Sequence, residues 1–267
     1  MIRVVVAGSG GWVGKALVPA VAAAKDLVLA AALSPRSAGQ DAGTAAGIAP
    51  LGVTVAASLA EALDTPSDVV IDYTRPDVVK SHVLTAIEAG RRVVVGTSGL
   101  GAADYLEIEN LALKHRVGVV AAGNFSITAT LLKRFALVAA RYVPDVEIVD
   151  YAGAGKLDAP SGTARELAET LAAIRGASTA RPVDDVAGIP ATRGAAVGGG
   201  AGVQVHAVRL PSYVLSCEAL FGLPDERLTI RHDAGSSALP YVAGTLLAVR
   251  RVMDIAGLVR GLDTLID

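Results

Sequence analysis

The chain has 267 residues, of which 52% are hydrophobic and 19% are charged, and its formal net charge is −2 at pH 7. This length supports one large core or two smaller ones, and the near-neutral charge predicts no recruitment of nucleic acid or of an anionic membrane. No apolar run reaches the roughly 20 residues of a membrane-spanning helix. The N-terminus shows no basic leader, so we expect a cytoplasmic protein without a membrane segment. Cys217 is the only cysteine, which excludes an internal disulfide.

The first half of the chain alternates short apolar runs with helical patterns. Residues 2–7 predict a strand that leads through a cluster of glycines into a helix over 15–24. Further strands are expected at 27–33, 69–72, 92–96 and 117–121, with helices at 78–89 and 102–115. Strands that alternate with helices predict a parallel sheet covered on both faces, a doubly wound α/β fold.

The pattern changes after residue 124. A helix is expected over 127–142, a strand over 146–151, a second helix over about 161–174 and a long loop over 175–202. Strands at 203–210, 214–221 and 227–232 then predict an antiparallel or mixed sheet, and 241–255 a last helix. We expect a dinucleotide-binding domain of residues 1–125 plus 236–267, with an inserted α+β substrate-binding and oligomerisation domain at 126–235.

Glycines between the first strand and the first helix indicate a nucleotide site. Gly8, Gly11 and Gly14 fit the spacing GxxGxxG, which lets a backbone approach a pyrophosphate at a helix N-terminus. The same glycines would also suit a tight turn without a ligand. If the turn binds a cofactor, Trp12 and Val13 lie in it, and Trp12 packs on the cofactor or on the protein.

The end of the second strand bears on the choice of cofactor. An acidic residue there binds the ribose 2′-hydroxyl of NADH, whereas a basic residue suits the 2′-phosphate of NADPH. This chain has no carboxylate at that place; it has Ser34 and Arg36. The pairing of a guanidinium with a phosphate favours NADPH, with NADH as the second possibility. The opposing interpretation is that Arg36 is an ordinary solvated loop residue.

The segment from Asp150 to Ala164, DYAGAGKLDAPSGTA, predicts an anion site. Lys156 stands just ahead of a Pro-Ser-Gly-Thr helix start, where Ser161, Gly162 and Thr163 offer free N–H groups and hydroxyls. These groups would bind a carboxylate of a small-molecule substrate. Plain helix capping beside a surface lysine is the alternative. No pair of histidines has the spacing of metal ligands, so we expect no metal site.

This segment resembles the KxDAPSGTA signature of dihydrodipicolinate reductases, and the resemblance extends over nearly the whole chain. The loops at 72–76, 96–99 and 121–126 look like the DFTRP, GTTG and ANFS segments of that family. The resemblance implies a Rossmann-type fold, a homotetramer, and a substrate that is a cyclic dicarboxylate. It also implies that further residues of these loops contact the cofactor, namely Thr74, Gly96, Thr97, Ala122, Asn124 and Phe125.

One departure from the family pattern concerns catalysis. The family carries a histidine pair just before this signature, and here the two positions are Ala152 and Gly153. Because hydride addition to an unsaturated imine leaves charge that an acid must neutralise, another donor would be needed: Lys156, Tyr151 or water. Of these, we select Lys156 as the catalytic candidate.

Three functions remain open on the sequence alone. We favour an NAD(P)H-dependent reductase of this type that acts on another carboxylate-bearing cyclic or conjugated imine. The alternatives are the genuine 4-hydroxy-tetrahydrodipicolinate reductase of lysine biosynthesis with a substitute proton donor, and a non-catalytic sensor of NADPH and a carboxylate.

Overall fold

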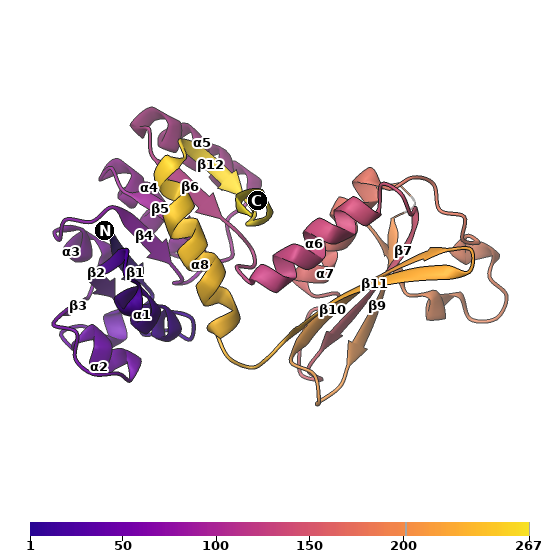
Figure 1. Cartoon of the computed structure of the whole chain (residues 1–267), viewed down its shortest axis with the longest axis horizontal. Helices are drawn as coiled ribbons and strands as arrows, with labels where there is room; N and C mark the ends of the chain where they lie inside the picture. The colour runs from indigo at the N-terminus through magenta and orange to yellow at the C-terminus, as the bar shows by residue number, and fades with distance from the viewer. Residues whose placement is uncertain (201, 267) are drawn as a thin grey trace. The chain divides into compact units, whose positions relative to one another are not determined.

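The computed structural model describes residues 1–200 and 202–266. The chain forms two compact units, Met1–Ile127 with Ser237–Asp267, and Thr128–Ser236 (Figure 1). Position 201, in the loop predicted over 175–202, lies outside the described residues. No helix in the described ranges is both long and apolar enough to cross a membrane.

The first unit is built on a seven-stranded sheet in which every neighbouring pair is parallel. Its order, β12-β6-β5-β4-β1-β2-β3, reverses direction between β1 and β4. The central strands are continuous runs of valine, isoleucine and alanine because both faces of the sheet are buried. The strands are β1 (Ile2–Ala7), β2 (Leu27–Leu33), β3 (Val55–Ala56), β4 (Val69–Asp72), β5 (Arg92–Val95), β6 (Gly118–Ala121) and β12 (Gly257–Arg260).

Helices cover both faces of this sheet, as the alternating pattern predicts. One buried cluster packs α1 and α8 against the sheet, and a second packs α3, α4 and α5 against the other face. The prediction of a doubly wound α/β fold is therefore confirmed, although the short strand β12 near the C-terminus was not expected. The helices are α1 (Gly14–Ala23), α2 (Ala42–Ala46), α3 (Leu59–Leu63), α4 (Val79–Glu88), α5 (Ala102–His115) and α8 (Leu239–Arg251).

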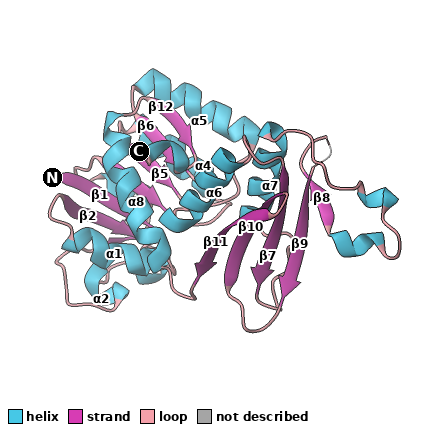
Figure 2. Ribbon diagram, turned by 45° about the vertical axis from the view of Figure 1, so that its right-hand side comes forward, coloured by secondary structure: helices cyan, strands magenta, loops and turns pink. Residues whose placement is uncertain are grey.

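The second unit holds a mixed five-stranded sheet, with the order β11-β10-β7-β9-β8 (Figure 2). Strand β7 pairs parallel with β9 and antiparallel with β10, so it lies between two strands that follow each other in sequence. Sequence proximity alone would have paired β9 with β10, and that expectation is wrong. The strands are β7 (Asp145–Ala152), β8 (Ala195–Val197), β9 (Val203–Arg209), β10 (Leu215–Leu223) and β11 (Glu226–Ala234).

Helices α6 (Ile127–Ala139) and α7 (Gly162–Ile174) bury one face of this sheet. Along β7 the exposure alternates residue by residue, which places Ile148, Asp150 and Ala152 on the helix-covered face. The segment predicted as one long loop includes β8 and two short 3₁₀ helices, at Val183–Asp185 and Pro190–Arg193.

Candidate functional site

The glycine-rich turn joins β1 to α1 at the point where the strand order reverses, the usual ligand-binding place of an open α/β sheet. Gly8 has a φ of +87°, and a Cβ on it would lie 2.2 Å from the carbonyl oxygen of Tyr73. A Cβ on Gly14 would lie 2.1 Å from the carbonyl oxygen of Gly8. The turn therefore requires glycine at both positions and leaves a cradle of bare backbone.

This cradle keeps free donors at the start of α1. The N–H of Gly11 donates to Gly8 at 2.9 Å and closes the turn. Within residues 1–200 and 202–266, the N–H groups of Trp12 and Val13 have no protein acceptor, and no side chain caps the helix. Such uncapped N–H groups suit a pyrophosphate. The Trp12 side chain is 58% exposed and packs edge-on against Tyr241, with ring centroids 5.7 Å apart.

The residues after β2 lie against this turn. Ser34 is buried, and its hydroxyl would be 2.6 Å from a Cβ on Gly10, so the third glycine of the cluster gives Ser34 room. Arg36 follows on a short 3₁₀ helix, Pro35–Ser37, and is exposed. The sequence therefore places a free guanidinium, and no carboxylate, on the loop that would face a ribose.

A buried carboxylate ties together two of the predicted cofactor loops. Asp72 ends β4 and is fully buried. Its Oδ1 accepts the N–H of Thr74 at 3.0 Å, the hydroxyl of Thr74 at 2.7 Å and the hydroxyl of Thr97 at 2.7 Å. Its Oδ2 lies 2.9 Å from Nδ1 of His82. Hydrogen bonds to a charged acceptor are the stronger ones, so Asp72 holds both loops in one conformation.

Sequence reasoning assigned His82 to the surface or to packing, and it overlooked Asp72 as a central residue. The contact between the two corrects that assignment, because His82 reaches back from α4 to the end of β4. A carboxylate at the carboxyl end of a buried strand was the available signal.

The third loop, after β6, contributes mainly backbone. Phe125 was expected to contact the cofactor, but its side chain is 1% exposed and packs against Tyr73 in the core. Only its backbone is available to a ligand. Asn124 accepts the N–H of Ser126 at 2.8 Å, and Ala122 donates to Val95 at 3.2 Å. Gly96 is required because the Tyr73 ring would lie 2.2 Å from a Cβ there.

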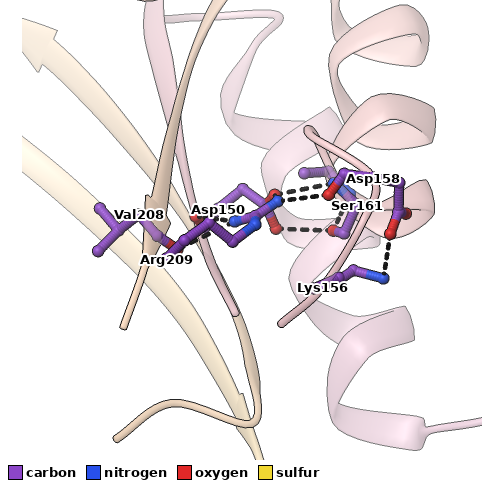
Figure 3. Close-up of polar contacts among 7 residues, drawn as sticks. Asp150, Lys156, Asp158, Ser161, Val208 and Arg209 are labelled. Atoms are coloured by element: carbon purple, nitrogen blue, oxygen red, sulfur yellow. Dashed lines mark hydrogen bonds and ion pairs between the residues drawn. The ribbon is translucent and has the colours of Figure 1, made fainter. Parts of the chain in front are cut away.

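The signature segment of the second unit surrounds another buried carboxylate (Figure 3). Asp150 accepts the N–H of Ser161 at 2.8 Å and its hydroxyl at 2.7 Å. Arg209, from β9, pairs with the same carboxylate at 2.8 Å and donates to the carbonyl of Asp158 at 2.9 Å. Asp150 and Arg209 were missed from the sequence, and together they fix the loop that carries Lys156.

The role expected for Ser161 needs correction. Its side chain is 2% exposed, donates to Asp150 and caps α7 by accepting from Ala164 at 3.4 Å. Its polar groups are therefore already engaged inside the protein. Gly162 is exposed and Thr163 half-buried at the first turn of α7, which leaves their N–H groups as the candidate anion donors.

Lys156 lies on the same loop and pairs with Asp158, with 2.7 Å between Nζ and Oδ1 (Figure 3). The ammonium lowers the pKa of Asp158 below its ordinary value. This pair is partly exposed, so the lysine can exchange its partner for a ligand carboxylate at small cost.

The positions of the missing histidines lie at the end of β7. Ala152 is 0% exposed on the helix-covered face, and a Cβ on Gly153 would lie 3.2 Å from the carbonyl of Tyr213. Tyr151 points to the opposite face, where its hydroxyl donates to Glu218 at 3.0 Å. Burial and that carboxylate raise the pKa of Tyr151, so it is unsuited as a donor on the α7 side.

The remaining histidines of this unit have structural partners. Nε2 of His206 lies 2.8 Å from Glu147, and Nδ1 of His232 lies 3.0 Å from the hydroxyl of Thr128. Burial lowers the pKa of His232. Neither histidine belongs to the signature loop.

Comparisons with known proteins cover the whole chain. The family model "Dihydrodipicolinate reductase, N-terminus" matches residues 2–125, and "Dihydrodipicolinate reductase, C-terminus" matches 127–266. A 4-hydroxy-tetrahydrodipicolinate reductase of Desulfitobacterium hafniense is 38% identical over 100% of this chain and 99% of its own. That of Synechococcus elongatus is 40% identical over 99% of this chain and 98% of its own.

Solved structures agree with these matches. The structure of a dipicolinate-bound dihydrodipicolinate reductase from Paenisporosarcina sp. TG-14 has a TM-score of 0.87, 32% identity and full coverage of both chains. An amine dehydrogenase from Mycobacterium smegmatis has a TM-score of 0.67 at 16% identity, over 98% of this chain and 95% of its own, and this likeness concerns the fold alone.

Proposed function

The chain belongs to the dihydrodipicolinate reductase family, a family of oxidoreductases, and from this premise we propose that it reduces 4-hydroxy-tetrahydrodipicolinate with NADPH. The observation that carries the proposal is the end-to-end match to reductases of that name. These relatives favour the lysine-biosynthesis alternative over the changed substrate that the missing histidines had suggested.

The cofactor part of the proposal rests on the first unit. The bare backbone cradle fits a dinucleotide, which when bound supplies the hydride. Trp12 and Val13 donate N–H groups to the pyrophosphate, and the Asp72-held loops with Thr74 and Thr97 position the nicotinamide end. Arg36 pairs with the 2′-phosphate. We therefore expect Arg36→Ala to raise KM for NADPH several-fold and leave KM for NADH unchanged.

The substrate part rests on the second unit. Lys156 and the N–H groups of Gly162 and Thr163 bind one carboxylate, through a point charge and the helix dipole. Hydride arrives at a ring carbon, the electron pair of the conjugated imine shifts away from it, and a proton neutralises the charge. With Ala152 and Gly153 unable to donate, Lys156 is the acid, directly or through water.

The decisive experiment incubates purified protein with NADPH and authentic 4-hydroxy-tetrahydrodipicolinate and follows the loss of NADPH absorbance. We expect turnover by the wild type, and no inflection of kcat at about 6.5, the ordinary pKa of histidine. Lys156→Ala should lower kcat/KM by about 10²-fold or more and leave NADPH affinity intact. Lys133→Ala is the matched control, because Lys133 also pairs with a carboxylate at 2.7 Å, Glu166.

Other outcomes identify the competing functions. Turnover only after Ala152→His would mean that the natural substrate is another imine. Tight NADPH binding without turnover in either protein would indicate the sensor. Equal losses of NADPH and substrate affinity in Lys156→Ala would refute the assignment of this lysine to the substrate alone.

The division of labour and the assembly complete the proposal. Residues 1–125 and 236–267 bind the nucleotide, and 126–235 bind the substrate and carry oligomerisation. The sheet face away from α6 and α7 offers the exposed edge strand β11, whose Leu228 is half exposed. We expect a cytoplasmic homotetramer, and sedimentation equilibrium would test its size.

A further inference from the structure

A second cavity lies in the second unit, near the beginning of β7. It has a volume of about 930 Å³ and lies between the sheet and the segment that follows α7. This volume is in the range of sites for small molecules, roughly 300 to 1,000 Å³. Its lining is rich in guanidinium groups, which come from Arg175, Arg181, Arg193 and Arg227.

Three of these guanidinium groups have no carboxylate partner in the part of the chain that the structure describes. Arg175 donates only to backbone carbonyls, those of Pro144 at 3.2 Å and Gly202. Arg181 and Arg227 are exposed at the mouth and form no ion pair among the described residues. Arg193 is paired with Glu147, which also binds His206.

The carboxylates of the lining do not neutralise this charge. Glu147 is shared between Arg193 and His206. Asp145 accepts from the hydroxyl of Ser178 and from the N–H and hydroxyl of Thr179, which lower its pKa. Asp184 lies at the exposed rim. The guanidinium groups of Arg175, Arg181 and Arg227 therefore remain available to an anion.

Two buried polar atoms of the lining residues lack a partner within the described chain. They are Nε of Arg193, a donor, and Oε1 of Gln204, an acceptor. Buried polar atoms are almost always hydrogen-bonded, so each such atom requires an explanation. An anion that also carries a hydroxyl would satisfy both, because its oxygen accepts from Arg193 and its hydroxyl donates to Gln204.

The cavity is separate from the Lys156 site. It includes Asp145, Val146 and Glu147 at the start of β7, whereas the signature loop follows Ala152 at its end. Eight residues of extended strand span about 23 Å at roughly 3.3 Å per residue. One small molecule cannot occupy both.

We propose that this cavity binds a hydroxylated organic anion of metabolite size, held by Arg175, Arg181 and Arg227 and by the unpartnered atoms of Arg193 and Gln204. The anionic groups are carboxylates or phosphates, since guanidinium groups recognise both in bidentate fashion. The proposal does not depend on the identity of the reductase substrate.

Calorimetric titration tests it on NADPH-saturated Lys156→Ala protein, in which the nucleotide site is filled and the substrate clamp is removed. The probes are citrate, a hydroxylated carboxylate, and glucose 6-phosphate, a hydroxylated phosphate, with glucose as the uncharged control. We expect one probe to bind and glucose not to bind. The probe that binds identifies the anionic group.

Adding Arg181→Ala and Arg227→Ala should weaken that binding at least tenfold. Both side chains are exposed, so the fold should tolerate their loss. Arg165→Ala, an exposed arginine of α7 outside the cavity, is the matched control and should bind normally.

Three results would overturn the proposal. The first is that neither probe binds, and the second is that the double arginine variant binds as tightly as its parent. The third is a change of oligomeric state in that variant without ligand, because the cavity would then be part of an interface between copies of the chain.

Discussion

Replacement of Asp72 by asparagine should weaken NADPH binding although no atom of Asp72 is exposed. In the wild type one carboxylate oxygen accepts three hydrogen bonds from Thr74 and Thr97, and the other faces His82. An asparagine can keep its oxygen toward the threonines and turn its NH₂ toward His82, whose neutral ring accepts at Nδ1. The geometry survives, and the charge is lost.

The magnitude follows from the change in bond type. Hydrogen bonds to a charged group contribute about 1.5–3 kcal/mol and neutral ones about 0.5–1.5 kcal/mol, so three bonds lose about 3 kcal/mol. Relief from burying a charge offsets part of this loss. A net 1–2 kcal/mol in the order of the loops is expected, which corresponds to about tenfold weaker NADPH binding. Asp72→Ala, which leaves four groups without an acceptor, should cost at least about 3 kcal/mol of stability.

The assay is fluorescence titration with NADPH alongside urea unfolding. Asp64→Asn serves as the control, because Asp64 is an exposed carboxylate of the same unit. An unchanged Kd in Asp72→Asn, with unchanged unfolding, would show that Asp72 does not order these loops. An equal loss in Asp64→Asn would show that the effect is one of net charge.

Three further predictions concern local packing and pH. Gly14→Ala should abolish NADPH binding, because its Cβ would lie 2.1 Å from the carbonyl of Gly8; titration showing near-normal affinity would contradict the cradle. Ser161→Ala removes a cap and a donor to buried Asp150, so urea unfolding should reveal a loss of about 2–4 kcal/mol; a loss below about 1 kcal/mol would refute that double role. Arg3 lowers the pKa of Asp68 to about 2, so this pair stabilises the fold above the unfolded-state pKa of about 3.9 and fades as pH falls toward 2. The stability difference between wild type and Asp68→Asn should therefore narrow below about pH 4, and a constant difference would argue against the pair.

Much of the first unit was predictable from local pattern. The helix expected over 102–115 is α5, and the strand expected over 69–72 is β4. Both follow from runs whose period and boundaries are written in adjacent residues. The family resemblance is confirmed by matches along the whole chain.

The second unit was predicted less completely because its strand order depends on distant partners. The strands at β9 and β10 were expected as neighbours, and β7, from about 55 residues earlier, separates them. Its pairing buries Asp150 beside Arg209, 59 residues away in the chain. No local period encodes such a contact.

The amino-acid sequence by itself determined the family, the alternation of strands and helices, and the glycines on which the nucleotide turn depends. These features are local, since they arise from side-chain period and backbone freedom. Only the tertiary structure decided that Ser161 is engaged by Asp150, that Phe125 lies in the core, and that His82 contacts Asp72. Those roles depend on which polar group meets which after packing, and buried groups take the partners that distant strands bring to them.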